Sequence, residues 1–138
     1  MGVREVIVQR VVARCAFPTG ERVPAELRYA ADEPYGVQIT VDDDPAAVHE
    51  VARTLLVQGI TGATGMGDAR AWPMIDRTGR ALVVLHLRSA QDEVVLELLT
   101  TQLDLFLGRT LALVPLGDES QLLDVDGVVA QLLAAGDA

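Results

Sequence analysis

A glycine-rich stretch at residues 59–73 constrains the fold more than any other part of the sequence. It separates two apolar halves of the chain and contains four glycines, followed by the only tryptophan. Because glycine lacks a Cβ atom, this backbone can turn sharply before it enters an extended segment that ends at Trp72-Pro73. The glycine spacing is compatible with phosphate binding, but a Rossmann loop lies between a strand and a helix. Here the expected order is helix, turn, strand, so we interpret the stretch as a structural turn.

The residues before this stretch predict a meander of strands. Residues 3–17 are rich in valine and isoleucine, and a strand of this length needs a bulge or a strong twist to stay packed. One face of it carries Val6, Val8 and Val12. Residues 23–30 predict a second strand. Residues 35–41 alternate apolar and polar side chains, which is the pattern of a half-buried strand.

The remaining elements are predicted from apolar spacing. Residues 46–58 follow helical spacing, and Gly59 stands where a C-terminal cap would fall. Residues 81–89 and 94–98 predict strands. An amphipathic helix, apolar at Leu99, Leu103, Phe106 and Leu107, is expected to end at Gly108. Residues 111–116 are then expected to be extended, and a last helix is expected to begin at Asp124.

The predicted strand at residues 81–89 is apolar on both faces. One face carries Leu82, Val84 and His86, and the other carries Val83, Leu85 and Leu87. Such a strand has to be covered twice, and the second cover is either a helix or another copy of the protein. We therefore predict a homo-oligomer, and we interpret His86 as a core or interface histidine.

Length and composition set the class of protein. A chain of 138 residues is a common size for one domain, so residues 1–138 are taken as a single domain. Although 50% of the residues are apolar, no run approaches the ~20 residues of a membrane-spanning helix. The first residues form no apolar leader, so we expect a cytoplasmic protein without membrane insertion. Cys15 is the single cysteine and is expected to be buried.

The charge of the chain disfavours nucleic acid as a partner. The formal net charge is -9, and the sequence contains no lysine. Nucleic-acid binders usually carry a basic stripe, because neutralising phosphates releases counterions. Arg4, Arg10 and Arg14 share one face of the first predicted strand and could form such a stripe, but a solvated strand face is the stronger interpretation.

Residue patterns typical of catalysis or metal binding were sought and not found. The sequence has no Gly-x-Ser-x-Gly elbow, no cysteine with a suitably placed histidine and no lysine for a Schiff base. The acidic run at residues 42–44 lacks the ligand spacing of a calcium loop. His49 and His86 are too few for a zinc site, which needs three or four convergent ligands. We expect no enzyme activity, no cofactor and no metal.

Several segments, in order and spacing, closely resemble the SsgA/SsgB-like proteins of actinomycetes. The resemblance covers residues 8–133, and its most specific block is residues 65–73. The segments are residues 23–29 (VPAELRY), 33–37 (EPYGV), 53–56 (RTLL), 64–73 (TGMGDARAWP), and 106–110 (FLGRT) with Val114-Pro115. Within them, the candidate structural or partner-binding positions are Tyr29, Pro34, Tyr35, Gly65, Gly67, Asp68, Arg70, Trp72, Pro73, Phe106, Leu107, Arg109 and Pro115.

The resemblance implies an α+β fold similar to the Whirly single-stranded nucleic-acid binders. This would be a single domain of antiparallel β-sheets with a short central helix, two C-terminal helices and a tendency to form trimers. It also implies that residues 47–52 form a strand and residues 53–58 a short helix. In function it implies a role in sporulation-linked cell division. In that family the SsgB type helps to recruit the tubulin-like division protein FtsZ to septum sites, and the SsgA type helps to localise SsgB.

Two hypotheses follow. The first is a non-enzymatic, oligomeric adaptor that contacts FtsZ or another SsgA-family protein and is recruited to division septa. The second is a single-stranded nucleic-acid binder that uses the Whirly-like surface. Stacking platforms need exposed aromatics beside basic residues, so five aromatics and strong acidity favour the adaptor. Which paralogue type the chain represents stays open. We further expect Gly65 and Gly67 to form the turn, Asp68 and Arg70 to be available for polar contacts, and Trp72-Pro73 to wedge against the core.

Overall fold

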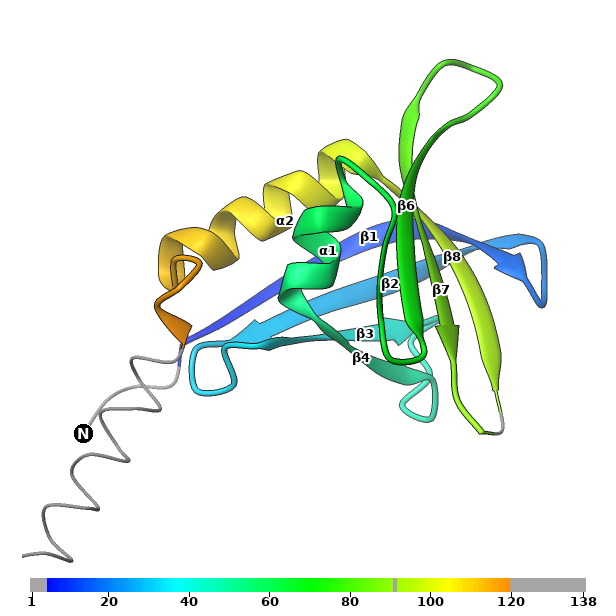
Figure 1. Cartoon of the computed structure of the whole chain (residues 1–138). Coiled ribbons are helices and arrows are strands. Elements are labelled where there is room, and N and C mark those ends of the chain that lie inside the picture. Colours follow the sequence, from blue (N-terminus) through cyan, green and yellow to red (C-terminus); the bar gives the residue numbers. More distant parts are fainter. Residues whose placement is uncertain (1–4, 91, 120–138) are drawn as a thin grey trace, which may run out of the picture.

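The computed structural model describes residues 5–90 and 92–119. These residues form one antiparallel sheet of eight strands and two helices (Figure 1). The strand order across the sheet is β4-β3-β2-β1-β8-β7-β6-β5. The elements are β1 (Val6–Phe17), β2 (Glu21–Ala30), β3 (Gly36–Val41), β4 (Val48–Ala52), α1 (Arg53–Gly59), β5 (Thr64–Met66), β6 (Ala69–Ile75), β7 (Ala81–Arg88), β8 (Glu93–Leu99) and α2 (Thr100–Leu113).

The long first strand joins the two halves of the sheet. It pairs with β2 from Val6 opposite Ala30 to Cys15 opposite Glu21, and its last part pairs with β8 on the other edge. The register with β8 shifts between Cys15 and Phe17, which confirms the irregularity expected for a strand of this length. The meander of β1, β2 and β3 is also confirmed.

The two faces of the sheet differ in what covers them. On the inner face, which carries both helices, the side chains of Val11, Ala13 and Cys15 are buried in the core. Strand geometry sends alternate residues to the outer face. There Val8 is 41% and Val12 57% exposed. The face that these valines share is therefore the solvent side of β1.

Both helices pack on the inner face (Figure 1) and close the core. The fully buried apolar side chains that they contribute are Leu55, Leu56, Leu103, Phe106 and Leu107. Each such side chain stabilises the fold by about 1.5–3 kcal/mol through removal from water. At the end of α1, a Cβ added to Gly59 would lie 2.7 Å from the Cβ of Ala71. Gly59 therefore allows close approach of α1 to β6, and it is the last residue of the helix rather than its cap.

The prediction of several antiparallel sheets with three helices is wrong for the described residues. They form one eight-stranded sheet, mostly β in character, with the short central helix α1 and the single C-terminal helix α2. The separate sheets were expected from the resemblance to the SsgA/SsgB-like proteins. Continuous pairing of β1 with both β2 and β8 instead joins the halves. The helix expected from Asp124 lies outside the described residues.

The predicted end of the amphipathic helix is wrong, whereas the strand and short helix predicted at residues 47–58 are confirmed. Helix α2 does not end at Gly108 but continues to Leu113, so the first half of the segment expected to be extended is helical. A glycine inside a helix costs about 1 kcal/mol relative to alanine, and burial of Thr110 and Val114 beyond it favours continuation. The strand-then-helix assignment at residues 47–58 is confirmed by β4 and α1.

Within the described part of the chain, neither helix has the length and apolar character needed to cross a membrane.

Candidate functional site

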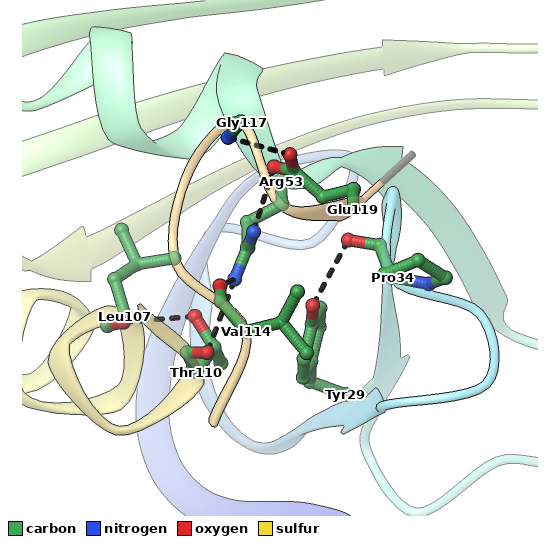
Figure 2. A network of polar contacts seen from close by, with 8 residues as sticks. All are labelled: Tyr29, Pro34, Arg53, Leu107, Thr110, Val114, Gly117 and Glu119. Atoms are coloured by element: carbon green, nitrogen blue, oxygen red, sulfur yellow. Dashed lines mark hydrogen bonds and ion pairs between the residues drawn. The ribbon is translucent and has the colours of Figure 1, made fainter. Parts of the chain in front are cut away.

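A buried arginine at the start of α1 organises the polar network shown in Figure 2. The side chain of Arg53 is fully buried. Its Nη1 atom donates to the carbonyl oxygens of Thr110 at 3.1 Å and Val114 at 2.6 Å, and its Nη2 atom donates to Glu119 Oε1 at 2.7 Å. The guanidinium carbon lies 4.9 Å from the centre of the Tyr29 ring, a cation–π arrangement. We call these five residues the Arg53 cluster.

The Arg53 cluster caps the C-terminal end of α2. The last carbonyls of a helix have no partner within the helix, and a cation there also interacts favourably with the helix dipole. Arg53 meets both requirements from a different helix. A buried charge is costly unless it is paired, and Glu119 supplies the carboxylate. The hydrogen bond from Arg53 lowers the pKa of Glu119 from its ordinary value, although burial opposes this shift.

The cluster also fixes the turn between β2 and β3. The Tyr29 hydroxyl donates to the carbonyl oxygen of Pro34 at 3.0 Å, and the backbone N–H of Arg53 donates to the carbonyl oxygen of Tyr35 at 2.8 Å. Burial raises the pKa of Tyr29. Tyr29 and Pro34 are buried, whereas Tyr35 is half exposed. Three expected positions from two segments of the sequence therefore meet around an arginine that sequence reasoning did not single out.

The expected positions on and after α2 divide between core and surface. Phe106 and Leu107 are buried in the core, whereas Arg109 and Pro115 are exposed. The local sequence does not distinguish Arg53 from Arg109, because each arginine begins the same run, Arg-Thr-Leu, within a helix. The distinguishing feature is the end of α2, which lies far from Arg53 in the sequence.

The glycine-rich stretch forms a tight hairpin between β5 and β6. Met66 pairs with Ala69, so Gly67 and Asp68 form a two-residue loop, and Gly67 has a φ angle of 60°. A glycine at the first position of such a loop is typical of a type II′ turn, which matches the twist of the strands. Gly65 lies within β5, opposite Arg70, and does not form the turn. Asp68 and Arg70 are exposed, as expected for polar contacts.

Trp72 does not wedge against the core, and this expectation is wrong. Its neighbour Ala71 is the β6 residue that packs in the core, so Trp72 points to the outer face, where it pairs with Val84 of β7 and is partly buried. Pro73 is exposed. The periodicity of β6 decides this orientation, because alternate side chains must point in opposite directions.

Strand β7 is apolar and buried on both faces within a single chain. On the outer face Leu82 is 7% and Val84 4% exposed, although neither helix covers that face. Their cross-strand neighbours on β6 are Met74 and Trp72. A second copy is therefore not needed to bury these two side chains of β7. His86 is also on the outer face, partly buried, with its Nε2 atom 2.7 Å from Glu93 Oε1.

Beside Leu82 the outer face is hollowed by a cavity of about 580 Å³, which we call the outer hollow. Its apolar lining includes Val12, Met74, Leu82 and Leu99. Its polar lining consists of Arg14, Arg22, Asp76, Arg77, Thr78, Arg80 and Glu97. These residues come from β1, β2, β6, β7, β8 and the loop that joins β6 to β7.

The loop between β6 and β7 is held by one carboxylate. Asp76 Oδ1 accepts hydrogen bonds from the backbone N–H groups of Thr78 and Arg80 at 2.8 and 2.9 Å, and from the Thr78 hydroxyl. Arg80 Nε lies 3.2 Å from Asp76 Oδ2. These hydrogen bonds, that from the Thr78 hydroxyl foremost, lower the pKa of Asp76 to about 2. The loop is therefore internally ordered rather than dependent on packing.

On β1, the arginines considered for a basic stripe are paired with carboxylates where they are described. Arg10 pairs with Asp43 at 3.0 Å, and Arg14 pairs with Glu97 at 3.2 Å. Arg4 lies outside the described residues. Among residues 5–90 and 92–119, no three His, Cys, Asp or Glu side chains come together as a metal site would require.

Comparison with known proteins identifies relatives over most of the chain. Residues 23–119 match the family described as "Streptomyces sporulation and cell division protein, SsgA". The sporulation-specific cell division protein SsgB of Streptomyces coelicolor is 39% identical over 114 residues, which is 81% of this chain and 82% of the relative. The protein of the same name from Frankia casuarinae is 34% identical over 134 residues, covering 94% of this chain and 93% of the relative.

Solved structures show the same relationship. The SsgA-like sporulation-specific cell division protein from Thermobifida fusca superposes with a TM-score of 0.79 at 33% identity, covering 95% of this chain and 98% of that one. A structure reported with SsgB mutations that correlate with longitudinal cell division in Streptomyces coelicolor gives a TM-score of 0.77 at 33% identity. It covers 88% of this chain and 98% of the other.

Proposed function

Because the chain belongs to the SsgA family of sporulation and cell division proteins, we propose that it is a non-enzymatic adaptor that helps to bring FtsZ to septum sites. The relatives are named sporulation-specific cell division proteins, which supports a role in sporulation division. The observation that carries the proposal is the similarity to SsgB proteins over nearly the full length of both chains. On the same ground we propose that it acts as the SsgB type rather than the SsgA type.

The distribution of polar groups supports an adaptor. The Arg53 cluster is buried and links two helices. The cluster therefore has no open position for a substrate. The accessible features are the outer face of the sheet, with Val8 and Val12 exposed, and the outer hollow. Exposed apolar surface next to polar groups is typical of protein–protein contact sites.

The adaptor acts as a homo-oligomer in this proposal, most simply a trimer. Exposed apolar side chains on β1 that lie outside the outer hollow, Val8 and Phe17, would be removed from water by association. Light scattering at micromolar concentration should give three times the chain mass of 14.7 kDa. A monomer mass would contradict this part of the proposal while leaving partner binding to be tested separately.

Binding to purified FtsZ tests the proposal directly. We expect immobilised protein to bind FtsZ in biolayer interferometry, and a fluorescent fusion to localise to septa in a sporulating actinomycete. A mutant protein that folds but carries charge reversals on the outer face provides the control for unspecific capture. If the protein neither binds FtsZ nor localises to septa, the adaptor proposal is wrong.

A further inference from the structure

We propose that the outer hollow binds an extended segment of a partner protein that is both acidic and apolar. The inference rests on the proposed function, since it names the surface through which the adaptor contacts its partner. The proposed ligand is a peptide segment in which carboxylates alternate with large apolar side chains.

The floor of the outer hollow suits apolar side chains. Val12, Leu82 and Leu99 line it together with Met74, and its volume of about 580 Å³ is large enough for more than a single water. Cavities of about 300–1,000 Å³ are those in which proteins bind small organic groups. Val12 is 57% exposed although it is apolar, so water contacts this floor in the isolated chain. Covering it would be favourable in proportion to the area removed from water.

The rim of the outer hollow carries excess positive charge. Four arginines line it against two carboxylates, and each carboxylate is paired with one arginine: Glu97 with Arg14 and Asp76 with Arg80. Arg22 and Arg77 are exposed and have no ion-pair partner among the described residues. On a chain of net charge -9 this local excess is unusual. Complementary charge selects an anionic partner and speeds its association.

The geometry of the rim is set before a partner arrives. Asp76 organises the loop that carries Arg77 through three hydrogen bonds, and Figure 1 shows this loop projecting beyond the body of the sheet. On the opposite side of the hollow, Arg22 sits on β2 opposite Arg14 of β1. An ordered rim loses little conformational entropy on binding, which favours affinity.

The chemistry of the floor favours a peptide over nucleic acid. Single-stranded nucleic acids bind by stacking bases on aromatic side chains. The lining of the outer hollow contains no aromatic ring, and its apolar members are aliphatic or methionine. Arginines would attract phosphates, but bases would find no stacking partner in the hollow. Nucleic acid is therefore an outcome that the test must exclude.

A labelled synthetic peptide of alternating leucine and aspartate is the direct probe. We expect it to bind the full chain in fluorescence anisotropy, and a peptide of alternating leucine and lysine not to bind. The double variant Arg22→Glu/Arg77→Glu should weaken binding about tenfold or more. The matched control Arg88→Glu/Arg109→Glu changes two exposed arginines outside the hollow by the same charge and should change affinity less than about twofold.

The floor is tested with Val12→Asp. Val12 is exposed, so the substitution should leave the melting temperature nearly unchanged. It should lower the affinity for the acidic peptide about tenfold. If Val12→Asp alters the mass in light scattering but not peptide affinity, the hollow is a contact between copies and the inference is overturned. Competition by a single-stranded oligonucleotide at physiological salt would overturn it equally.

Parallel FtsZ measurements separate this inference from the proposed function. If FtsZ binds wild type and Arg22→Glu/Arg77→Glu equally, the hollow is not the docking site, although the adaptor function stands. If FtsZ does not bind while the acidic peptide binds and responds to the double variant, the adaptor proposal is wrong and the hollow remains a peptide site.

Discussion

The Arg53 cluster and the outer hollow use the same side chain in opposite ways. In the cluster, the guanidinium of Arg53 is fully buried and bonded to two carbonyls and a carboxylate. At the hollow, Arg22 and Arg77 are exposed and have no ion-pair partner among the described residues. A charge that is paired and buried holds the fold together, whereas an unpaired exposed charge is available to a partner. The comparison separates residues that matter for stability from those that matter for binding.

The largest expected effect is a loss of stability when the Arg53 cluster is broken. Arg53→Ala should lower the free energy of unfolding by about 3–5 kcal/mol, because it leaves the buried carboxylate of Glu119 without its cation and removes the hydrogen bonds to the carbonyl oxygens of Thr110 and Val114. Urea denaturation measures this, with Arg109→Ala as the exposed control, expected within about 0.5 kcal/mol of wild type.

Arg53→Ala could fail to fold, so Arg53→Lys provides a second measurement. Lysine retains the charge but lacks the planar fork that reaches several acceptors at once. Its stability should fall between those of wild type and Arg53→Ala. A lysine variant as stable as wild type would show that charge alone holds the cluster.

A smaller loss of stability is expected for Trp72→Ala, at about 1–2 kcal/mol, because the indole is partly exposed on the outer face. Phe106→Ala, which empties a fully buried site on the inner face, should cost about 3–5 kcal/mol. Thermal unfolding of both variants compares the two faces directly. Equal losses would contradict the outer placement of Trp72.

Acid should destabilise the fold by protonating Glu119 in the Arg53 cluster. Its folded pKa is lowered from the ordinary value of a glutamate, because Arg53 hydrogen-bonds to the ionised form. A lowered folded pKa means that the ionised carboxylate contributes stability above its unfolded pKa, and that this contribution is lost as pH falls through the folded value. Urea unfolding of wild type and Glu119→Gln from pH 7 to pH 3 should show a steeper acid loss for wild type. Parallel curves would mean that Glu119 does not couple to folding.

The smallest effect is expected for Arg70→Ala. Arg70 is exposed on the outer face but does not line the hollow. Its removal should leave the free energy of unfolding within about 0.5 kcal/mol of wild type. We expect a weaker effect on FtsZ affinity than for Arg22→Glu/Arg77→Glu, measured by interferometry on the same samples. A larger loss at Arg70 would move the docking surface toward the β5–β6 hairpin.

The sequence predicted the strands whose side chains alternate clearly. In β3, Val37, Ile39 and Val41 alternate with polar residues, and all three are buried as the period requires. The doubly apolar character of β7 was also visible. Local periodicity decides such strands, since one face meets the core along the whole element.

Features that depend on distant contacts could not be predicted. Helix α2 continues past Gly108 because Thr110 is buried and Leu113 packs against the core, not because of intrinsic propensity. The importance of Arg53 depends on where α2 ends. Its partner Thr110, near that end, lies 57 residues after Arg53 in the sequence. The outer hollow gathers residues from five strands and a loop, and no segment of sequence contains that arrangement.

Hydrogen–deuterium exchange of the full chain with and without FtsZ tests the central claim most directly, because it reports both faces in one experiment. The account predicts protection of the β6–β7 loop around Arg77 and of the β1–β2 segment around Arg22, with no added protection at the Arg53 cluster. Protection confined to α2, or to the turn that Tyr29 and Pro34 hold, would contradict it.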